Sequence, residues 1–176
     1  MITKSSMVRG ARKRALTLVE AMMSAMILAV VAVAASQAIV AGQMQTYDAM
    51  HRQRALTLAD SLMDEILRLP YDDPDGSSTP GPESGEIRTT FDNLDDFHGF
   101  TEAGSRTIAA GSLVDATGTA YGDPYQVFTH SATVAASTQN VTNLGGAITG
   151  MLVTVTVQDD DSQSWSIESF VPNPTQ

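Results

Sequence analysis

The chain has 176 residues, of which 43% are hydrophobic, and its formal net charge at neutral pH is -10. This length suits one domain of ordinary size with a packed core. The sequence contains no cysteine, which excludes disulfides, thiolate metal sites and a cysteine nucleophile. The acidic balance argues against a nucleic-acid partner, whose phosphates need a basic surface.

The first 15 residues form a basic segment, and the chain becomes apolar directly after them. Five of the 10 basic residues fall before position 15, and no acidic residue occurs before Glu20. A basic segment ahead of a long apolar run is typical of membrane targeting. By the positive-inside rule the N-terminus then stays in the cytoplasm while the rest of the chain crosses outward.

One long helix is predicted over residues 16–69, with its first half in the membrane. Residues 16–41 carry a single charge, that of Glu20, and exceed the ~20 residues that a bilayer-spanning helix needs. Helical periodicity then continues to Pro70, the first proline of the chain. The apolar stripe of this second half comprises Met44, Tyr47, His51, Ala55, Leu58, Leu62, Ile66 and Leu69.

Glu20 is the one charged residue inside the apolar run. A carboxylate at that depth costs several kcal/mol unless it is paired, so we treat Glu20 as a candidate functional residue. The alternative is that its side chain lies among the lipid headgroups and stays hydrated.

The composition changes after Leu69, where residues 70–83 are rich in turn-forming proline, glycine and aspartate. The pattern predicts a short strand at 86–91, loops over 92–122, and strands at 125–135, 147–157 and 163–171. Turns are expected at 143–146 and 159–162. The predicted fold class is α+β, with the long helix packed on an antiparallel sheet of three or four strands.

No enzyme motif is present: the chain has no Gly-rich phosphate loop, no nucleophile elbow and no His-Glu-x-x-His. We therefore expect no catalytic residues and no cofactor, and we expect His51 to pack on the helix stripe. Acidic loops can hold calcium through oxygen ligands, although a hydrated acidic surface is the simpler interpretation. The weak candidates are Asp92, Asp95 and Asp96 in one loop and Asp159, Asp160 and Asp161 in another.

Residues 14–21, Arg-Ala-Leu-Thr-Leu-Val-Glu-Ala, lead into the proline-free apolar helix. This segment resembles the prepilin cleavage signal of type IV pilins and type II secretion pseudopilins, with Ala15 in place of the family's glycine and Leu16 in place of its phenylalanine. The resemblance implies that a prepilin peptidase cuts between Ala15 and Leu16 and that Leu16 becomes N-methylated. It also implies that Glu20 pairs with the N-terminal amine of a neighbouring subunit, and that the fold is ladle-shaped.

Together these features predict a structural subunit, a minor pilin or pseudopilin, of a type IV pilus-like or type II secretion filament in the bacterial inner membrane. Its expected partners are the prepilin peptidase and other subunits. The predicted organisation is a leader over 1–15, a transmembrane and assembly segment over 16–43 and a periplasmic head over 44–176. Two alternatives remain open: a membrane-anchored binding module that does not polymerise, and a secreted soluble protein cut near Ala34.

Overall fold

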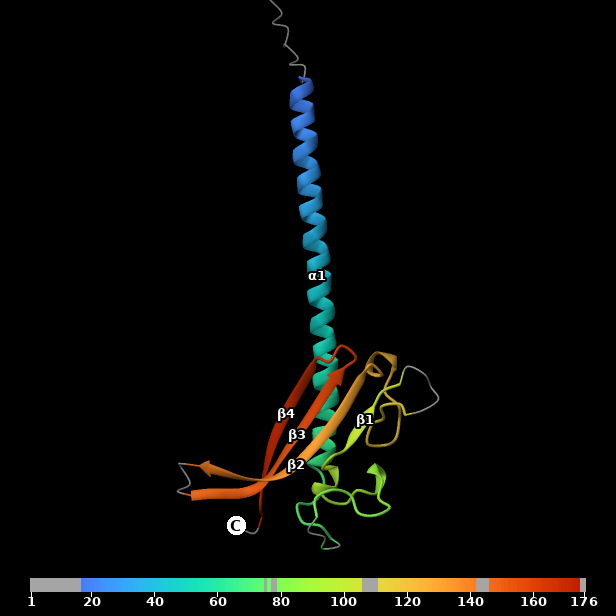
Figure 1. Cartoon of the computed structure of the whole chain (residues 1–176), viewed down its shortest axis with the longest axis vertical. Helices are drawn as coiled ribbons and strands as arrows, with labels where there is room; N and C mark the ends of the chain where they lie inside the picture. The colour runs from blue at the N-terminus through green and yellow to red at the C-terminus, as the bar shows by residue number, and fades with distance from the viewer. Residues whose placement is uncertain (1–16, 75, 77–78, 106–110, 142–145, 175–176) are drawn as a thin grey trace, which may run out of the picture. The chain divides into compact units, whose positions relative to one another are not determined.

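The computed structural model describes residues 17–74, 76, 79–105, 111–141 and 146–174. These residues fall into two units, and the boundary between the units lies between Tyr47 and Asp48. The helix α1 (Leu18–Ile66) begins in the first unit and ends in the second. All the described strands belong to the second unit, which we call the head (Figure 1).

The helix α1 confirms the prediction from periodicity, with ends displaced by a few residues. Its sequence is rich in alanine, leucine and methionine, which have high helix propensity. At its start, the hydroxyl of Thr17 accepts a hydrogen bond from the backbone N–H of Glu20 (3.3 Å). At its end the backbone tightens into a turn in which the N–H of Leu69 donates to the carbonyl of Ile66 (3.1 Å). Pro70 follows, and it cannot continue a helix.

A four-stranded antiparallel sheet forms the rest of the head, so the predicted α+β fold class is confirmed (Figure 1). The strands are β1 (Thr101–Ala103), β2 (Phe128–Val141), β3 (Gly146–Asp159) and β4 (Ser164–Pro172). They lie side by side in chain order. The last three correspond to the three main predicted strands, and β1 arises inside a segment that was predicted as loop.

The strand predicted over residues 86–91 is wrong. The chain there forms a single 3₁₀ turn, Arg88–Thr90. The hydroxyl of Thr90 accepts the backbone N–H of Ile87 (3.0 Å) and donates to the carbonyl of the same residue (2.9 Å). Because one side chain satisfies both backbone groups of Ile87 locally, this segment does not join the sheet ladder.

The hydrophobic core lies between one face of α1 and one face of the sheet. On β2 and β3 alternate side chains are buried, as expected for strands with one face on the core. The register pairs Val134 with Val153 and Ala132 with Val155. Burial of a helix side chain such as Leu58 contributes ~1.5–3 kcal/mol. The helix contributes Ala55, Leu58, Ala59, Leu62, Met63 and Ile66.

The predicted apolar stripe of the helix is too long at its N-terminal end. Met44 and Tyr47 are 64% and 60% exposed, whereas His51 is half-buried and Ala55 is fully buried. Steps of three and four place residues on one face of a helix, but they do not say where the opposing surface begins. Packing on the sheet therefore starts near His51.

The turn between β3 and β4 confirms the connection predicted at 159–162. The N–H of Asp159 donates to the carbonyl of Gln163 (3.0 Å), and Ser162 has a φ of 65°. The connection predicted at 143–146 lies largely outside the described residues. On either side of it, β2 and β3 pair with each other beyond the end of β4, because the pairing of β4 with β3 stops at Gly150 while that of β2 with β3 continues to Gly146 (Figure 1).

Candidate functional site

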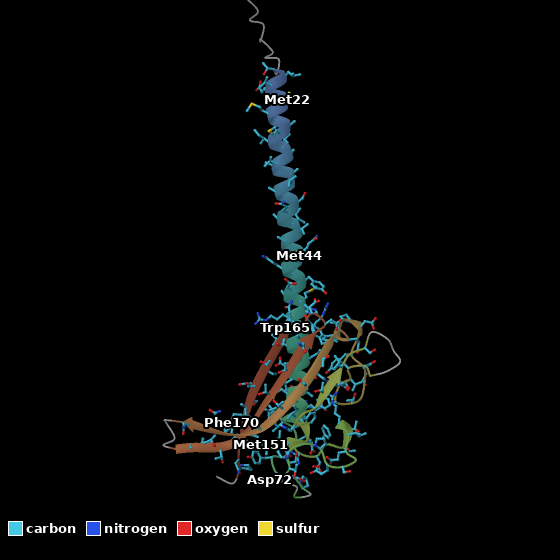
Figure 2. The ribbon with its side chains drawn as sticks, in the orientation of Figure 1. Met22, Met44, Asp72, Met151, Trp165 and Phe170 are labelled. Atoms are coloured by element: carbon cyan, nitrogen blue, oxygen red, sulfur yellow. The ribbon has the colours of Figure 1, made fainter. Side chains whose placement is uncertain are left out.

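The part of α1 that lies in the first unit, from Leu18 to Tyr47, presents apolar side chains around its whole circumference. One helix in the described part of the chain, α1, is long and apolar enough to cross a membrane, and its most apolar stretch is entirely exposed. Met22 and Met44 project away from the helix backbone (Figure 2). Its large exposed residues are Leu18, Val19, Met22, Met23, Met26, Ile27, Leu28, Val30, Val31, Val33, Ile39, Val40, Met44 and Tyr47.

Such a surface is not stable in water, since exposed apolar area of this extent marks contact with lipid or with other protein chains. A membrane-spanning anchor and an assembly surface both account for it. A signal sequence near the N-terminus has the same composition, so composition alone leaves the secreted alternative open.

Glu20 lies in the first turn of α1 and is exposed. Its backbone N–H is bound by the Thr17 hydroxyl, and an acidic side chain at this position also interacts favourably with the positive end of the helix dipole. The structure therefore adds a local role, stabilising the start of the helix, to the two roles that the sequence suggested. Ala15 and Leu16, the predicted cleavage and methylation positions, lie outside the described residues.

The head contains a partly buried network of charges around Arg88. Its guanidinium binds Glu65 on α1 in a bidentate manner, with Nε–Oε1 at 2.9 Å and Nη2–Oε2 at 2.6 Å. Its Nη1 donates to Oε2 of Glu102 on β1 (2.8 Å) and to the carbonyl of Val114 (3.0 Å). The same guanidinium lies 5.3 Å from the centre of the Phe100 ring. One side chain thus joins α1, β1 and the loop that contains Val114.

His130 on β2 extends this network. Its Nε2 is 2.8 Å from Oε2 of Glu102, and the histidine side chain is 1% exposed. Burial by itself would raise the pKa of Glu102, but the hydrogen bond from His130 and the charge of Arg88 outweigh it, so the pKa lies below its ordinary value. Glu102 therefore stays ionised at neutral pH. The network therefore links α1, β1 and β2 within the head.

His51 packs as the sequence analysis expected, and it also has a polar partner. Its ring lies 4.6 Å from that of Phe128 and 5.8 Å from that of Trp165. Its Nε2 is 3.0 Å from Oδ2 of Asp159. The other oxygen, Oδ1, accepts the backbone N–H groups of Asp161 (3.0 Å) and Gln163 (2.8 Å). Oδ1 of Asp159 thus stabilises the β3–β4 turn, and Oδ2 links this turn to α1.

The two loops that were weak calcium candidates differ in structure. Asp160 and Asp161 are exposed on the β3–β4 turn. In the first loop, Asp96 is buried, and one carboxylate oxygen each of Glu83, Glu86 and Asp96 lie within 4.8 Å of one another. Burial, followed by the charges of Asp96, Asp73 and Glu83, raises the pKa of Asp95 above its ordinary value. Negative charge is therefore concentrated in this part of the head.

Sequence reasoning missed Glu83, Glu86 and the whole Arg88 network. Glu65, Arg88, Glu102 and His130 are separated by long stretches of chain and follow no common period. The turn-rich composition around Glu83 gave no indication of which acidic residues would meet. Comparison with family models, with curated proteins and with solved structures gives no match.

Proposed function

We propose that this protein is a structural subunit, a minor pilin or pseudopilin, of a filament of the type IV pilus or type II secretion kind. In this proposal it is inserted in the bacterial inner membrane, cut between Ala15 and Leu16 by a prepilin peptidase, and N-methylated at Leu16. It then assembles with other subunits through its N-terminal helix. The observation that carries the proposal is a single helix that is apolar and exposed from Leu18 to Tyr47 and packed on the sheet from Ala55 to Ile66.

The physical mechanism uses the same apolar surface twice. In the bilayer, lipid chains cover the exposed residues of α1. In a filament, the helices of neighbouring subunits cover them, and the burial of apolar area then stabilises the fibre. The head remains folded throughout, because its core takes only the residues of α1 that follow His51.

Glu20 gives the assembly its axial register in this proposal. Cleavage creates a new cation, the α-amine of Leu16, and a neighbouring subunit displaced along the fibre brings its own amine to this carboxylate. Attraction between the two charges is much stronger away from water than at an exposed surface. An unpaired carboxylate would instead keep its desolvation cost within the fibre.

Two alternative functions would use the same N-terminal helix in a different way. A membrane-anchored binding module needs the same exposed helix but no partner for Glu20. A secreted protein cut near Ala34 would lose the most apolar part of α1. Against that alternative, α1 runs through residues 32–34 without interruption, and its apolar segment is longer than the core of an ordinary signal peptide.

Replacing Glu20 separates the pairing role from the local interaction of its side chain with the helix dipole. For Glu20→Val we expect normal membrane insertion, cleavage that is largely unaffected, and a sharp fall in the fraction of subunit found in sheared or secreted fibres. Glu20→Asp should give an intermediate value, because its shorter side chain reaches the amine poorly. The measurement is the amount of subunit in the fibre fraction relative to the membrane fraction.

Glu20→Gln is the matched control, because it keeps the size and the hydrogen-bonding ability of the side chain but removes its charge. If pairing with the amine matters, the glutamine variant should behave like the valine variant. If Glu20 only stabilises the first turn of α1 through the helix dipole, which contributes about 0.3–1 kcal/mol, both the glutamine and the valine variants should assemble nearly as well as the wild type. Normal incorporation of the valine variant would contradict the pairing role altogether.

A further inference from the structure

The hairpin of β2 and β3 projects beyond the rest of the sheet as a two-stranded arm, which comprises residues 136–141 and 146–151 (Figure 1). On one side of it, β1 pairs with β2 only at residues 129–131, and on the other side β4 ends opposite Gly150. The base of the arm is closely packed, because a Cβ at Gly150 would lie only 2.7 Å from the ring of Phe170. The arm is therefore a continuation of the sheet that its neighbouring strands do not cover.

The β2 edge of the arm presents backbone groups that can pair with another strand. The direction of this edge follows from Ala132, whose N–H donates to the carbonyl of Phe100 on the β1 side (2.9 Å). Backbone groups alternate in direction along a strand, so every second residue of β2 faces the same side. Those in the arm are Ala136, Thr138 and Asn140, and their N–H and C=O groups have no hydrogen-bond partner in the described part of the chain.

The arm lacks the features that usually protect an open edge. Natural sheets discourage edge-to-edge pairing with charged side chains or with proline. The outer edge of β4 follows this rule, since it carries the exposed Glu168 and ends at Pro172. Residues 131–158, which include the whole arm, contain no Asp, Glu, Lys, Arg or Pro. The two open edges of the head thus differ, and only that of β2 is left without protection among the described strands.

We propose that the β2 edge of the arm is a self-association site, at which it pairs in the antiparallel direction with the same edge of a second copy. With the twofold axis at Thr138, this residue faces Thr138 of the second copy, and Ala136 faces Asn140. Each outward N–H then meets a carbonyl, and both copies use the same surface, as an isologous dimer requires. The sheets of the two heads become one continuous sheet.

The charge distribution favours a second copy of this chain as the occupant. The head is acidic, but the arm carries no charge. A charged partner of either sign would find no complementary charge along this edge, whereas two identical uncharged edges meet without repulsion. Because the arm projects beyond β1 and β4, the meeting point also lies away from the acidic loops. This inference uses residues of the head alone and does not depend on the proposed role in a filament.

Disulfide cross-linking of the full chain in detergent tests the site, and the natural sequence has no cysteine that would interfere. Facing residues of adjacent antiparallel strands have Cα atoms about 4.5–5.5 Å apart, which a disulfide can span. Thr138→Cys should therefore give a covalent dimer under mild oxidation. Ala147→Cys is the matched control, because Ala147 is equally exposed but lies on β3, about 14 Å from its counterpart across three strand spacings. It should cross-link at least about tenfold more slowly.

Lysine substitutions test the same contact without a covalent bond. Thr138→Lys places two ammonium groups opposite each other in the paired strands, so the dissociation constant of the dimer, measured by sedimentation, should rise about fivefold. Ala147→Lys should leave it within about twofold of the wild-type value, and both variants should keep the wild-type Tm because both positions are exposed. Equal cross-linking at the two positions, or equal dissociation constants for the two lysine variants, would overturn the proposal. A monomeric wild type would do so too and would leave this edge for a strand of a different protein.

Discussion

A fragment that begins at residue 44 should be soluble and should unfold cooperatively, whereas a fragment that begins at residue 71 should aggregate. The first removes the exposed apolar part of α1 and keeps every helical residue that packs on the sheet. The second removes six buried helical side chains, and the four large ones among them, Leu58, Leu62, Met63 and Ile66, contribute ~1.5–3 kcal/mol each. The loss is comparable to the whole stability of a typical domain, about 5–15 kcal/mol, and it leaves one face of the sheet exposed to water.

The two fragments are compared by size-exclusion chromatography and by urea unfolding at the same protein concentration. A third fragment that begins at Asp48 is the matched control for the boundary, because Met44 and Tyr47 are exposed. It should be as stable as the fragment that begins at residue 44. Equal behaviour of the 44–176 and 71–176 fragments would show that α1 does not stabilise the sheet.

Replacing Arg88 should give the largest effect of any single charged residue in the head. Arg88→Met removes the cation that binds both Glu65 and Glu102, whose side chains are only 15% and 22% exposed. Breaking a buried ion pair by removing one partner costs about 3–5 kcal/mol. Because the two carboxylates keep some contact with water, we expect a loss of about 3 kcal/mol, close to the lower end of that range.

Urea unfolding of the 44–176 fragment at neutral pH measures this loss. Arg88→Lys keeps the charge but not the bidentate geometry, so it should lose roughly half as much. Arg52→Met changes an exposed arginine of α1 and should alter the free energy of unfolding by less than about 0.5 kcal/mol. If Arg88→Met is no more destabilising than Arg52→Met, the network does not hold the head together.

The long helix and the main strands are predictable because each has a repeated local signal. The helix has no proline, an uninterrupted apolar first half and a 3.6-residue period in its second half, and β3 alternates valine and threonine over Val153–Val157. β1 has no such signal: its three residues, Thr-Glu-Ala, become a strand only by pairing with β2. Tertiary context rather than local propensity makes that element.

The charged clusters of the head are not predictable for a related reason. Asp159 looks like any acidic loop residue, yet its two oxygens have three partners, one of them on α1. Arg88 meets its two glutamate partners only after the helix and sheet are in place. Asp95 and Asp96 are neighbours in the sequence, and only the folded structure shows that Asp96 is buried.

The mass of the N-terminal peptide of the protein, isolated from membranes of cells that contain a prepilin peptidase, tests the filament proposal most directly. The proposal predicts a chain that begins at Leu16 and carries one added methyl group on its α-amine. Replacing Ala15 by a bulky residue should prevent this processing and leave the basic leader attached. An intact Met1 in the wild type, or a chain that begins near Ala35, would contradict the proposal and would favour the membrane-anchored module or the secreted protein, respectively.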